Sequence, residues 1–407
     1  MTDETLLAPL DAGTPETAPL TLAHTINGGS LAGITFKNAL LNIPTLGIWS
    51  FWAKTRVRRY LWSNIQIAGD PLHYTGTGFE LFKGAIIALL VLTALFVPLG
   101  LLSTAGYEQI AGPIQFLIFI LLTPLGMFFA RRYRLSRTEW RGIRAGFQGD
   151  WKAFAPRAAG LTLLSVLTLG FAEPFRQVYI ERYFWNNSYF GTEKFKSSLS
   201  IGRLGYLYWG LWVISVLFLA LAFIDSTFFF REMTNFNANF TDSTAHQNFA
   251  VFFLFLFVAT TTLLQAMALL RIQIFRASAS ALSLGGLDLR SKLSSWRVIK
   301  LFLRAVLILL IPGMIAVGFG YYVLSIFAGI AAKIAPWLSF GVYGAGTLVV
   351  LAAVSAVWAR LWTARLAAEI IGTLSISGDI DDLSIHQSTL PTPGRGEGLL
   401  GAVDFAG

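Results

Sequence analysis

The chain contains no cysteine and has little charge. Of its 407 residues, 13% are charged and 55% are hydrophobic, whereas a soluble domain carries about 25% charged residues. The absence of cysteine excludes disulfides, thiol catalysis and cysteine-based metal sites. The scarcity of charge, with a mean hydropathy of +0.62, excludes an ordinary soluble enzyme and a disordered protein. The composition predicts a polytopic helical membrane protein.

Both ends of the chain lack long apolar runs. Residues 1–25 are rich in proline, threonine and alanine, and we expect a solvated, disordered, acidic tail rather than a signal peptide. Residues 387–407 are rich in proline and glycine and are predicted to form a second disordered tail. Between the tails we expect a first membrane repeat over 26–150, a second over 151–297, and a C-terminal helical pair with a strand pair over 298–386.

Six segments are apolar and long enough to cross a bilayer, which takes about 20 residues. They are 82–102, 114–130, 204–224, 249–270, 300–323 and 338–362. Two further windows, 31–53 and 157–175, are apolar but interrupted near their middle. Because proline and glycine break helices, each window is predicted to be two half-helices joined by a turn. Such a broken hairpin would be re-entrant.

Basic residues gather on alternate connections. Clusters follow the windows 31–53, 114–130, 157–175, 249–270 and 338–362. The other connections, 103–113, 225–248 and 324–337, hold only Arg231 and Lys333 among the 31 basic residues. Cytoplasmic loops collect lysine and arginine, which places the clusters and both termini in the cytoplasm. Six transmembrane helices plus two re-entrant hairpins satisfy this rule, whereas eight membrane helices, the alternative, put basic clusters outside.

A shift of 123 positions aligns two parts of the chain without a gap. It pairs Thr45-Leu46-Gly47 with Thr168-Leu169-Gly170, Arg59-Tyr60 with Arg182-Tyr183, Trp62 with Trp185, and Asn64 with Asn187. Matches of arginine, tyrosine, tryptophan and asparagine in register are uncommon by chance. We interpret them as an internal duplication.

Short alternating stretches follow two of the basic clusters. Residues 64–68 and 72–74 lie on either side of Gly69-Asp70, and residues 373–377 precede Gly378-Asp379 and 383–386. Period-two alternation next to a Gly-Asp turn is typical of a β-hairpin. The predicted fold is therefore an all-α membrane bundle with short cytoplasmic β-hairpins beneath it.

A set of motifs extends from the first interrupted window to the second membrane segment. It comprises Thr45-Leu46-Gly47-Ile48, Trp52-Ala53-Lys54, Arg58-Arg59-Tyr60, Tyr74-Thr75-Gly76-Thr77-Gly78 and Trp140-Arg141-Gly142-Ile143-Arg144. These motifs resemble the YjgN-like bacterial inner-membrane proteins, closely over about 36–150 and more loosely afterwards, where Glu173-Pro174-Phe175 departs from the pattern. The resemblance implies a multi-pass protein of a Gram-negative inner membrane, in a family without an established function. It brings no catalytic residue.

No catalytic, cofactor or metal site is predicted, and we expect no enzyme. The four histidines are far apart and lack metal-ligand spacing. Gly76-Thr77-Gly78 lacks the spacing of a phosphate loop and is interpreted as a turn and N-cap that open a helix. Glu173, beside Pro174 in the second interrupted window, is expected to hydrogen-bond at a helix end.

The basic clusters favour contact with membrane lipids through anionic headgroups, rather than with nucleic acid. Each juxtamembrane lysine or arginine adds about 1 kcal/mol of attraction to an anionic bilayer. The candidate headgroup contacts are Lys54, Arg56, Arg58, Arg59, Arg131, Arg132, Arg134 and Arg182. The sequence identifies no protein partner.

Duplicated short segments interrupted by glycine or proline are typical of transporters with a site at the bilayer midplane. We therefore expect a transporter or lipid-handling protein whose site lies between the two hairpin tips. The tip residues are Pro44, Thr45, Leu46 and Gly47, and Thr168, Leu169 and Gly170. The alternative is a non-transporting envelope scaffold that recruits a partner or anionic lipids through its basic cytoplasmic face.

Overall fold

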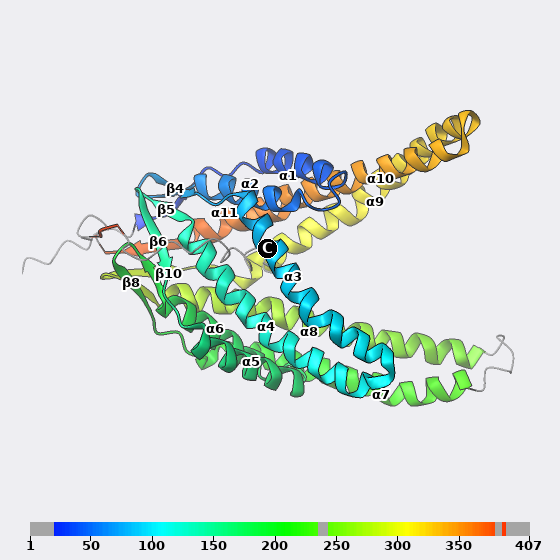
Figure 1. Ribbon diagram of the computed structural model, residues 1–407, viewed down its shortest axis with the longest axis horizontal. Coiled ribbons are helices and arrows are strands. Elements are labelled where there is room, and N and C mark those ends of the chain that lie inside the picture. Colours follow the sequence, from blue (N-terminus) through cyan, green and yellow to red (C-terminus); the bar gives the residue numbers. More distant parts are fainter. Residues whose placement is uncertain (1–19, 235–242, 379–384, 388–407) are drawn as a thin grey trace, which may run out of the picture.

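The computed structural model describes residues 20–234, 243–378 and 385–387. This part of the chain forms long helices and one antiparallel sheet of short strands. Figure 1 shows the sheet at one end of the molecule, with the helices projecting from it.

Five helical stretches in the described chain have the length and apolar composition of membrane spans. They are Gly78–Ser136, Tyr206–Ile224, Val251–Ser280, Ser295–Ile334 and Pro336–Gly372. Within the first stretch, Gly106 adopts a φ of +92°, which interrupts the helix. That stretch therefore holds two helices, α3 (Gly78–Leu102) and α4 (Glu108–Ser136), joined by the π-helical segment η1 (Ser103–Tyr107).

The remaining long helices form two pairs, in which α7 packs along α8 and α9 packs along α10. Their bounds are α7 (Tyr206–Thr234), α8 (Ser243–Ser280), α9 (Ser295–Ile334) and α10 (Pro336–Trp358). A 3-10 turn, η2 (Gly202–Gly205), precedes α7, and α10 continues through η3 (Ala359–Thr363) into α11 (Ala364–Gly372). Each of the six predicted apolar segments falls on one of α3, α4, α7, α8, α9 and α10, except that 204–224 begins in η2 and 338–362 runs on into η3.

The two interrupted windows are confirmed as pairs of helices. The pairs are α1 (Gly28–Asn42) with α2 (Ser50–Ser63), and α5 (Trp151–Leu167) with α6 (Glu173–Asn186). We call residues 28–63 the first hairpin and residues 151–186 the second hairpin. In each, the two helices pack against one another, so the chain turns back as the sequence predicts.

Short strands connect successive helices at the sheet. They are β1 (Leu20–Thr21), β2 (Ala23–His24), β3 (Ile65–Ile67), β4 (Asp70–Tyr74), β5 (Thr138–Trp140), β6 (Ile143–Phe147), β7 (Ser188–Phe190), β8 (Glu193–Ser197), β9 (Leu282–Leu284), β10 (Leu287–Ser291) and β11 (Leu374–Ser377). They pair in the order β1-β11-β10-β9-β8-β7-β6-β5-β4-β3-β2. Because only Leu22 separates β1 from β2 along the chain, the sheet curls until its two ends meet. The all-α prediction is therefore incomplete, since the strands join into one 11-stranded sheet. The expected hairpin around Gly69-Asp70 forms, but the predicted pairing of 373–377 with 383–386 is wrong, because β11 pairs with β1 and β10 on its two sides.

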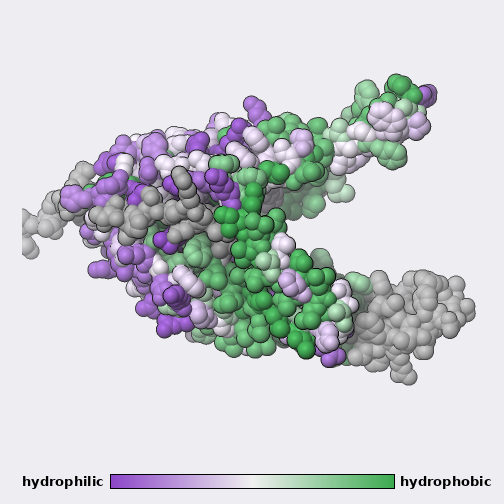
Figure 2. All heavy atoms as spheres, viewed as in Figure 1, coloured by the Kyte–Doolittle hydropathy of each residue, from purple (hydrophilic) through white to green (hydrophobic). Residues whose placement is uncertain are grey.

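The sheet has an apolar face and a polar face because side chains alternate along each strand. Tyr74, Trp140 and Leu287 are buried on the apolar face, where Trp62 of α2 contacts Tyr74. His73 and Lys194 are exposed on the polar face. Figure 2 shows the same division across the molecule, with hydrophilic residues at the sheet end and hydrophobic residues over the projecting helices.

The structure corrects the inner boundaries of the two predicted tails. Residues 20–24 form β1 and β2 rather than disordered chain, because their backbone pairs with β11 and β3. The Gln387 side chain donates to the carbonyl oxygen of Gly142 (2.9 Å) and accepts from the backbone N–H of Arg144 (3.0 Å). The tail segments 1–19 and 388–407 lie outside the described residues, as do 379–384, which include part of the last predicted strand.

Candidate functional site

The tip of the first hairpin is a tight turn stabilised by one threonine. The Thr45 hydroxyl donates to the carbonyl oxygen of Leu41 (2.9 Å) and accepts from the backbone N–H of Trp49 (3.1 Å). Leu46 and Gly47 then adopt φ values of +50° and +87°. Few non-glycine residues tolerate a positive φ, yet the Leu46 side chain is 93% exposed. The turn therefore presents an apolar side chain at its outermost point.

The tip of the second hairpin repeats this turn. The Thr168 hydroxyl donates to the carbonyl oxygen of Leu164 (2.7 Å) and accepts from the backbone N–H of Ala172 (3.2 Å). Leu169 and Gly170 have φ values of +51° and +97°, and Leu169 is 56% exposed. Pro44 is not part of the shared pattern, because the second hairpin has Leu167 in the matching place.

At the end of each hairpin opposite its tip, a tyrosine hydroxyl makes the same two hydrogen bonds to the backbone. The Tyr60 hydroxyl donates to the carbonyl oxygen of Asn27 and accepts from its N–H, both at 2.9 Å. Tyr183 makes the same pair of bonds to Asp150, at 2.8 and 2.9 Å. Burial raises the pKa of the Tyr183 hydroxyl above its usual value, so this hydroxyl keeps the proton that it donates.

The sheet register recurs with the same spacing. Ala23 pairs with Gln66 in the first unit, and Gly146 pairs with Tyr189 in the second. Each residue of the first pair lies 123 positions before its counterpart in the second pair, as in the sequence alignment. The same holds for the partners in the threonine and tyrosine bonds. Hairpin and adjoining strands therefore share one local structure.

The second tip, unlike the first, is held by another helix. Tyr208, Trp209 and Trp212 of α7 donate to the carbonyl oxygens of Gly170 (2.6 Å), Phe171 (3.1 Å) and Leu169 (2.9 Å). We call these three side chains the α7 clamp. Among the described residues, no side chain of another helix donates to a carbonyl of the first tip.

Glu173 is buried at the start of α6 and is fully engaged there. Its carboxylate pairs with Arg176 and accepts hydrogen bonds from Gln177 (2.8 Å) and Ser165 (3.1 Å). The expected role of Glu173 as a hydrogen-bonded helix end is confirmed. The bond between Ser165 and Glu173 also links α5 to α6 at the base of the second tip.

The structure does not bring the two tips together. The first hairpin packs mainly on α10, whereas the second packs on α4 and, through its tip, on α7. Figure 1 places the two hairpins on different sides of the α3–α4 pair. In the described chain, the predicted tip residues therefore line two separate places instead of one shared site.

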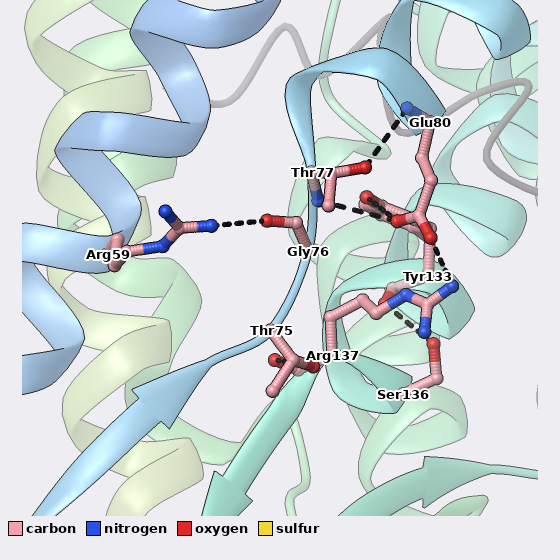
Figure 3. A network of polar contacts seen from close by, with 8 residues as sticks. All are labelled: Arg59, Thr75, Gly76, Thr77, Glu80, Tyr133, Ser136 and Arg137. Atoms are coloured by element: carbon pink, nitrogen blue, oxygen red, sulfur yellow. Dashed lines mark hydrogen bonds and ion pairs between the residues drawn. The ribbon is translucent and has the colours of Figure 1, made fainter.

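A polar network lies where α3 and α4 meet the sheet (Figure 3). Thr77 and Glu80 form a capping box at the start of α3, which confirms the predicted turn and N-cap. The Glu80 carboxylate also pairs with Arg137 (2.7 Å) and accepts from the Tyr133 hydroxyl (3.0 Å). Arg59 of α2 donates to the carbonyl oxygen of Gly76 (3.2 Å), which joins the first hairpin to this network.

The predicted headgroup contacts differ in their accessibility. Arg56, Arg59 and Arg182 are exposed. Lys54, Arg58, Arg132 and Arg134 are half-buried, and Arg58 bonds the Tyr74 hydroxyl (3.4 Å). Arg131 points inward, with its guanidinium 4.4 Å from the Trp185 ring centroid. Its Nε and Nη2 atoms are buried without a hydrogen-bond partner, so Arg131 is not a surface contact.

The first hairpin carries a groove between α1 and α2 on its exposed side. The groove has a volume of about 280 Å³ and is lined by Ile34, Lys37, Arg56, Arg59, Tyr60 and Ser63. We call it the basic groove, because it holds three cationic side chains and no acidic one. Sequence reasoning missed Lys37 and Ser63. The turn at Leu46 was the available signal, since a hairpin folded there places Lys37 opposite Arg56.

A second groove lies where the first hairpin meets α9 and α10. Its volume is about 440 Å³, and its lining residues are Leu31, Thr35, Val57, Leu309, Leu351, Val354, Ser355, Trp358, Ala359 and Thr363. We call it the apolar groove, because the only polar groups in its lining residues besides the backbone are three hydroxyls and the Trp358 indole N–H. The two grooves use different faces of the same helices.

Comparison with known proteins places the chain among bacterial proteins. A family model described as "Bacterial protein of unknown function (DUF898)" matches residues 19–402. The chain is 34% identical over 128 residues to the inner membrane protein YjgN of Salmonella typhimurium (strain LT2), which is 31% of each chain. It is 26% identical over 137 residues to the inner membrane protein YjgN of Escherichia coli (strain K12), covering 34% of this chain and 33% of the relative. These matches span about a third of the relatives' length, and no solved structure matches the chain.

Proposed function

Because the chain belongs to the DUF898 family and is similar to inner-membrane proteins, we propose that it is a lipid-handling protein of the bacterial inner membrane. In this proposal α3, α4, α7, α8, α9 and α10 cross the bilayer. The two hairpins enter the inner leaflet from the cytoplasmic side, and the sheet and both termini lie in the cytoplasm. The hairpins bind phospholipids there and alter their packing.

The observation that carries the proposal is the exposed leucine at each hairpin tip. Leu46 and Leu169 occupy strained positive-φ positions and are exposed, an arrangement that water penalises and hydrocarbon favours. Figure 1 shows the first hairpin lying beside α10, with its turn directed away from the sheet. About ten residues separate Leu46 from Arg56, so a helical rise of about 1.5 Å per residue puts the tip roughly 15 Å beyond the basic groove. This is about half of the ~30 Å hydrocarbon core.

The distribution of polar residues supports the orientation. Hydrophilic residues gather at the sheet end of the molecule (Figure 2), and positive charge collects on the cytoplasmic side of membrane proteins. The helix breaks at 43–49 and 168–172 favour six spans with two hairpins over eight straight membrane helices. The recurring hydrogen bonds of the hairpins favour a duplication as their origin.

Two features favour lipid handling over transport of a polar solute. The separated tips offer no common midplane site in the described chain. The adjacent hydroxyls of Thr260, Thr261 and Thr262 in α8 all donate to carbonyls of their own helix, so they have no O–H left to donate to a solute.

The topology is testable with single cysteines, because the chain has none of its own. We expect Arg182→Cys to react with a water-soluble maleimide only from the cytoplasmic side. We expect Leu46→Cys and Leu169→Cys to be protected from both sides in intact membranes and to react after solubilisation. Labelling of Arg182→Cys from outside would exclude the proposed orientation.

The function is testable with changes at both tips. A Leu46→Asp/Leu169→Asp double variant puts charge where the proposal needs hydrocarbon, and Leu46→Ala/Leu169→Ala is the matched control. We expect the aspartate variant alone to reproduce the membrane lipid composition of cells that lack the protein. If it inserts stably and lipid composition matches wild type, lipid handling is wrong. Recovery of one stoichiometric partner crosslinked to the sheet of that variant would then favour the scaffold alternative.

A further inference from the structure

We propose that the basic groove of the first hairpin binds the phosphate of an anionic phospholipid headgroup, and that the second hairpin has no such site. This inference rests on the proposed function, because a lipid phosphate reaches the groove only if the first hairpin lies in the leaflet. It assigns the ligand to one hairpin of an otherwise matching pair.

Two of the three cations of the groove are held in place by other groups of the protein. Arg59 donates to the Gly76 carbonyl oxygen, a contact visible in Figure 3. A guanidinium has five N–H donors, so several remain for a ligand. The Arg56 guanidinium lies 5.0 Å from the ring centroid of Trp49. Both arginines are therefore oriented before a ligand arrives, which lowers the entropy lost on binding.

The charge of the remaining groove lining suits a phosphate. Lys37 brings a third positive charge from α1. The hydroxyls of Tyr60 and Ser63 also line the groove, but they donate to the carbonyl oxygens of Asn27 (2.9 Å) and Tyr60 (3.1 Å), so the three cations carry the binding. Charge-assisted hydrogen bonds to phosphate oxygens are stronger than neutral ones, and no acidic side chain lines the groove to oppose them.

The second hairpin serves as an internal comparison. In the 123-residue register, Gly160 replaces Lys37 and Tyr179 replaces Arg56. Arg157 replaces Ile34 and Arg182 keeps the charge of Arg59, so the matching positions hold two cations instead of three. The ring of Tyr179 stacks on Phe154 at 6.1 Å. Cytoplasmic topology alone requires positive charge on both hairpins, but it does not require three cations around one groove. The difference therefore points to binding at the first hairpin.

The apolar groove gives the same hairpin a place for hydrocarbon. Leu31, Thr35 and Val57 line it. Leu31 and Val57 also pack beside Ala359 and Ala364, and the register-equivalent residues Phe154, Ala158 and Ile180 pack with Phe128. The first hairpin thus has a cationic face and an open apolar face, a combination that matches a phospholipid surface better than it matches a free anion.

Binding of a defined lipid to the purified full-length protein tests the proposal. We would titrate phosphatidylglycerol into the protein in detergent and count bound lipids by native mass spectrometry, with zwitterionic phosphatidylcholine as the comparison without net charge. Lys37→Gln/Arg56→Gln should weaken phosphatidylglycerol binding about 10- to 30-fold, the loss expected for two headgroup contacts. Lys37→Arg/Arg56→Lys should keep it within about threefold of wild type.

Arg182→Gln is the matched control, because Arg182 occupies the place of Arg59 in the second hairpin. We expect it to leave phosphatidylglycerol binding unchanged. Equal loss in Arg182→Gln, or no loss in Lys37→Gln/Arg56→Gln, would overturn the proposal. Displacement of phosphatidylglycerol by equimolar inorganic phosphate would also overturn it, since the groove would then be a site for a free anion. Because these measurements need no lipid change in cells, their outcome is separate from that of the tip variants.

Discussion

Glu80 is the residue through which α3, α4 and the linker from the sheet are held together. Its carboxylate caps α3, pairs with Arg137 and accepts from Tyr133 (Figure 3). Arg137 depends on this contact, because its Nε atom is buried without a hydrogen-bond partner. Loss of the carboxylate charge would leave a partly buried cation without its counter-ion.

We predict that Glu80→Gln lowers the free energy of unfolding by about 1.5 to 3 kcal/mol, the usual range for a hydrogen bond to a charged group. The glutamine keeps the shape of the side chain but loses the charge. Thermal unfolding in detergent measures the change. Glu108→Gln, an exposed glutamate at the start of α4, is the control and should unfold with the wild-type protein. Equal unfolding of Glu80→Gln and wild type would show that the network does not stabilise the helix junction.

The roles of single residues differ in how well they can be predicted from the sequence. Thr45 and Gly47 are predictable as a helix break, because glycine and the preceding proline disrupt a helix. Arg131 is not, since it belongs to a basic cluster typical of a cytoplasmic loop and yet lies inward over Trp185. A cluster of charges indicates a side of the membrane, but the direction of each side chain depends on the helix face that it occupies.

At the scale of elements, the two hairpins share a fold but not an attachment. The α7 clamp holds three carbonyls of the second tip, while the first tip relies on its own threonine. In hydrocarbon, a carbonyl without a partner costs several kcal/mol. The clamp therefore holds the second tip in one position, whereas the first tip lacks such an attachment.

We predict that a nitroxide spin label at Leu46 is more mobile than one at Leu169 when the protein is in lipid nanodiscs. Continuous-wave electron paramagnetic resonance measures this mobility. Tyr208→Phe removes one donor of the clamp with little change in volume, and should raise the mobility of the Leu169 label alone. Identical spectra at both tips, or no response at Leu169, would contradict the role of the clamp.

Helices and strands were unequally predictable. The six apolar segments and both broken windows follow from runs of about 20 residues, in which many side chains agree. Strands such as β5 and β7 contain three residues each, too few for alternation to stand out. The predicted β-hairpin around Gly69-Asp70 was recognisable because its turn residues added a second signal, and the pairing of β3 with β4 confirms it.

At the scale of the whole molecule, the sheet gathers the ends of helices that are far apart in sequence. Neighbouring strands are mostly neighbours along the chain, but β1 pairs with β11 across the length of the protein. The sequence predicted separate hairpins and could not predict this closure. Pairing between distant strands depends on where the helices place them, and residues 20–24 carry no apolar run that marks them as part of the fold.

The closure of the sheet depends on one short segment, in which β1 pairs with β11 and β2 with β3. We predict that Ala23→Pro opens the sheet, because proline has no N–H to donate to β3 and fixes its own φ. The loss should be about 1 to 3 kcal/mol and should appear as a lower melting temperature in detergent. Hydrogen exchange should rise in both β3 and β11, although only β3 pairs with residue 23 directly. Ala23→Val keeps the N–H and should behave as wild type. Faster exchange confined to β3 would mean that β1 holds β11 independently and that the two ends of the sheet are not coupled.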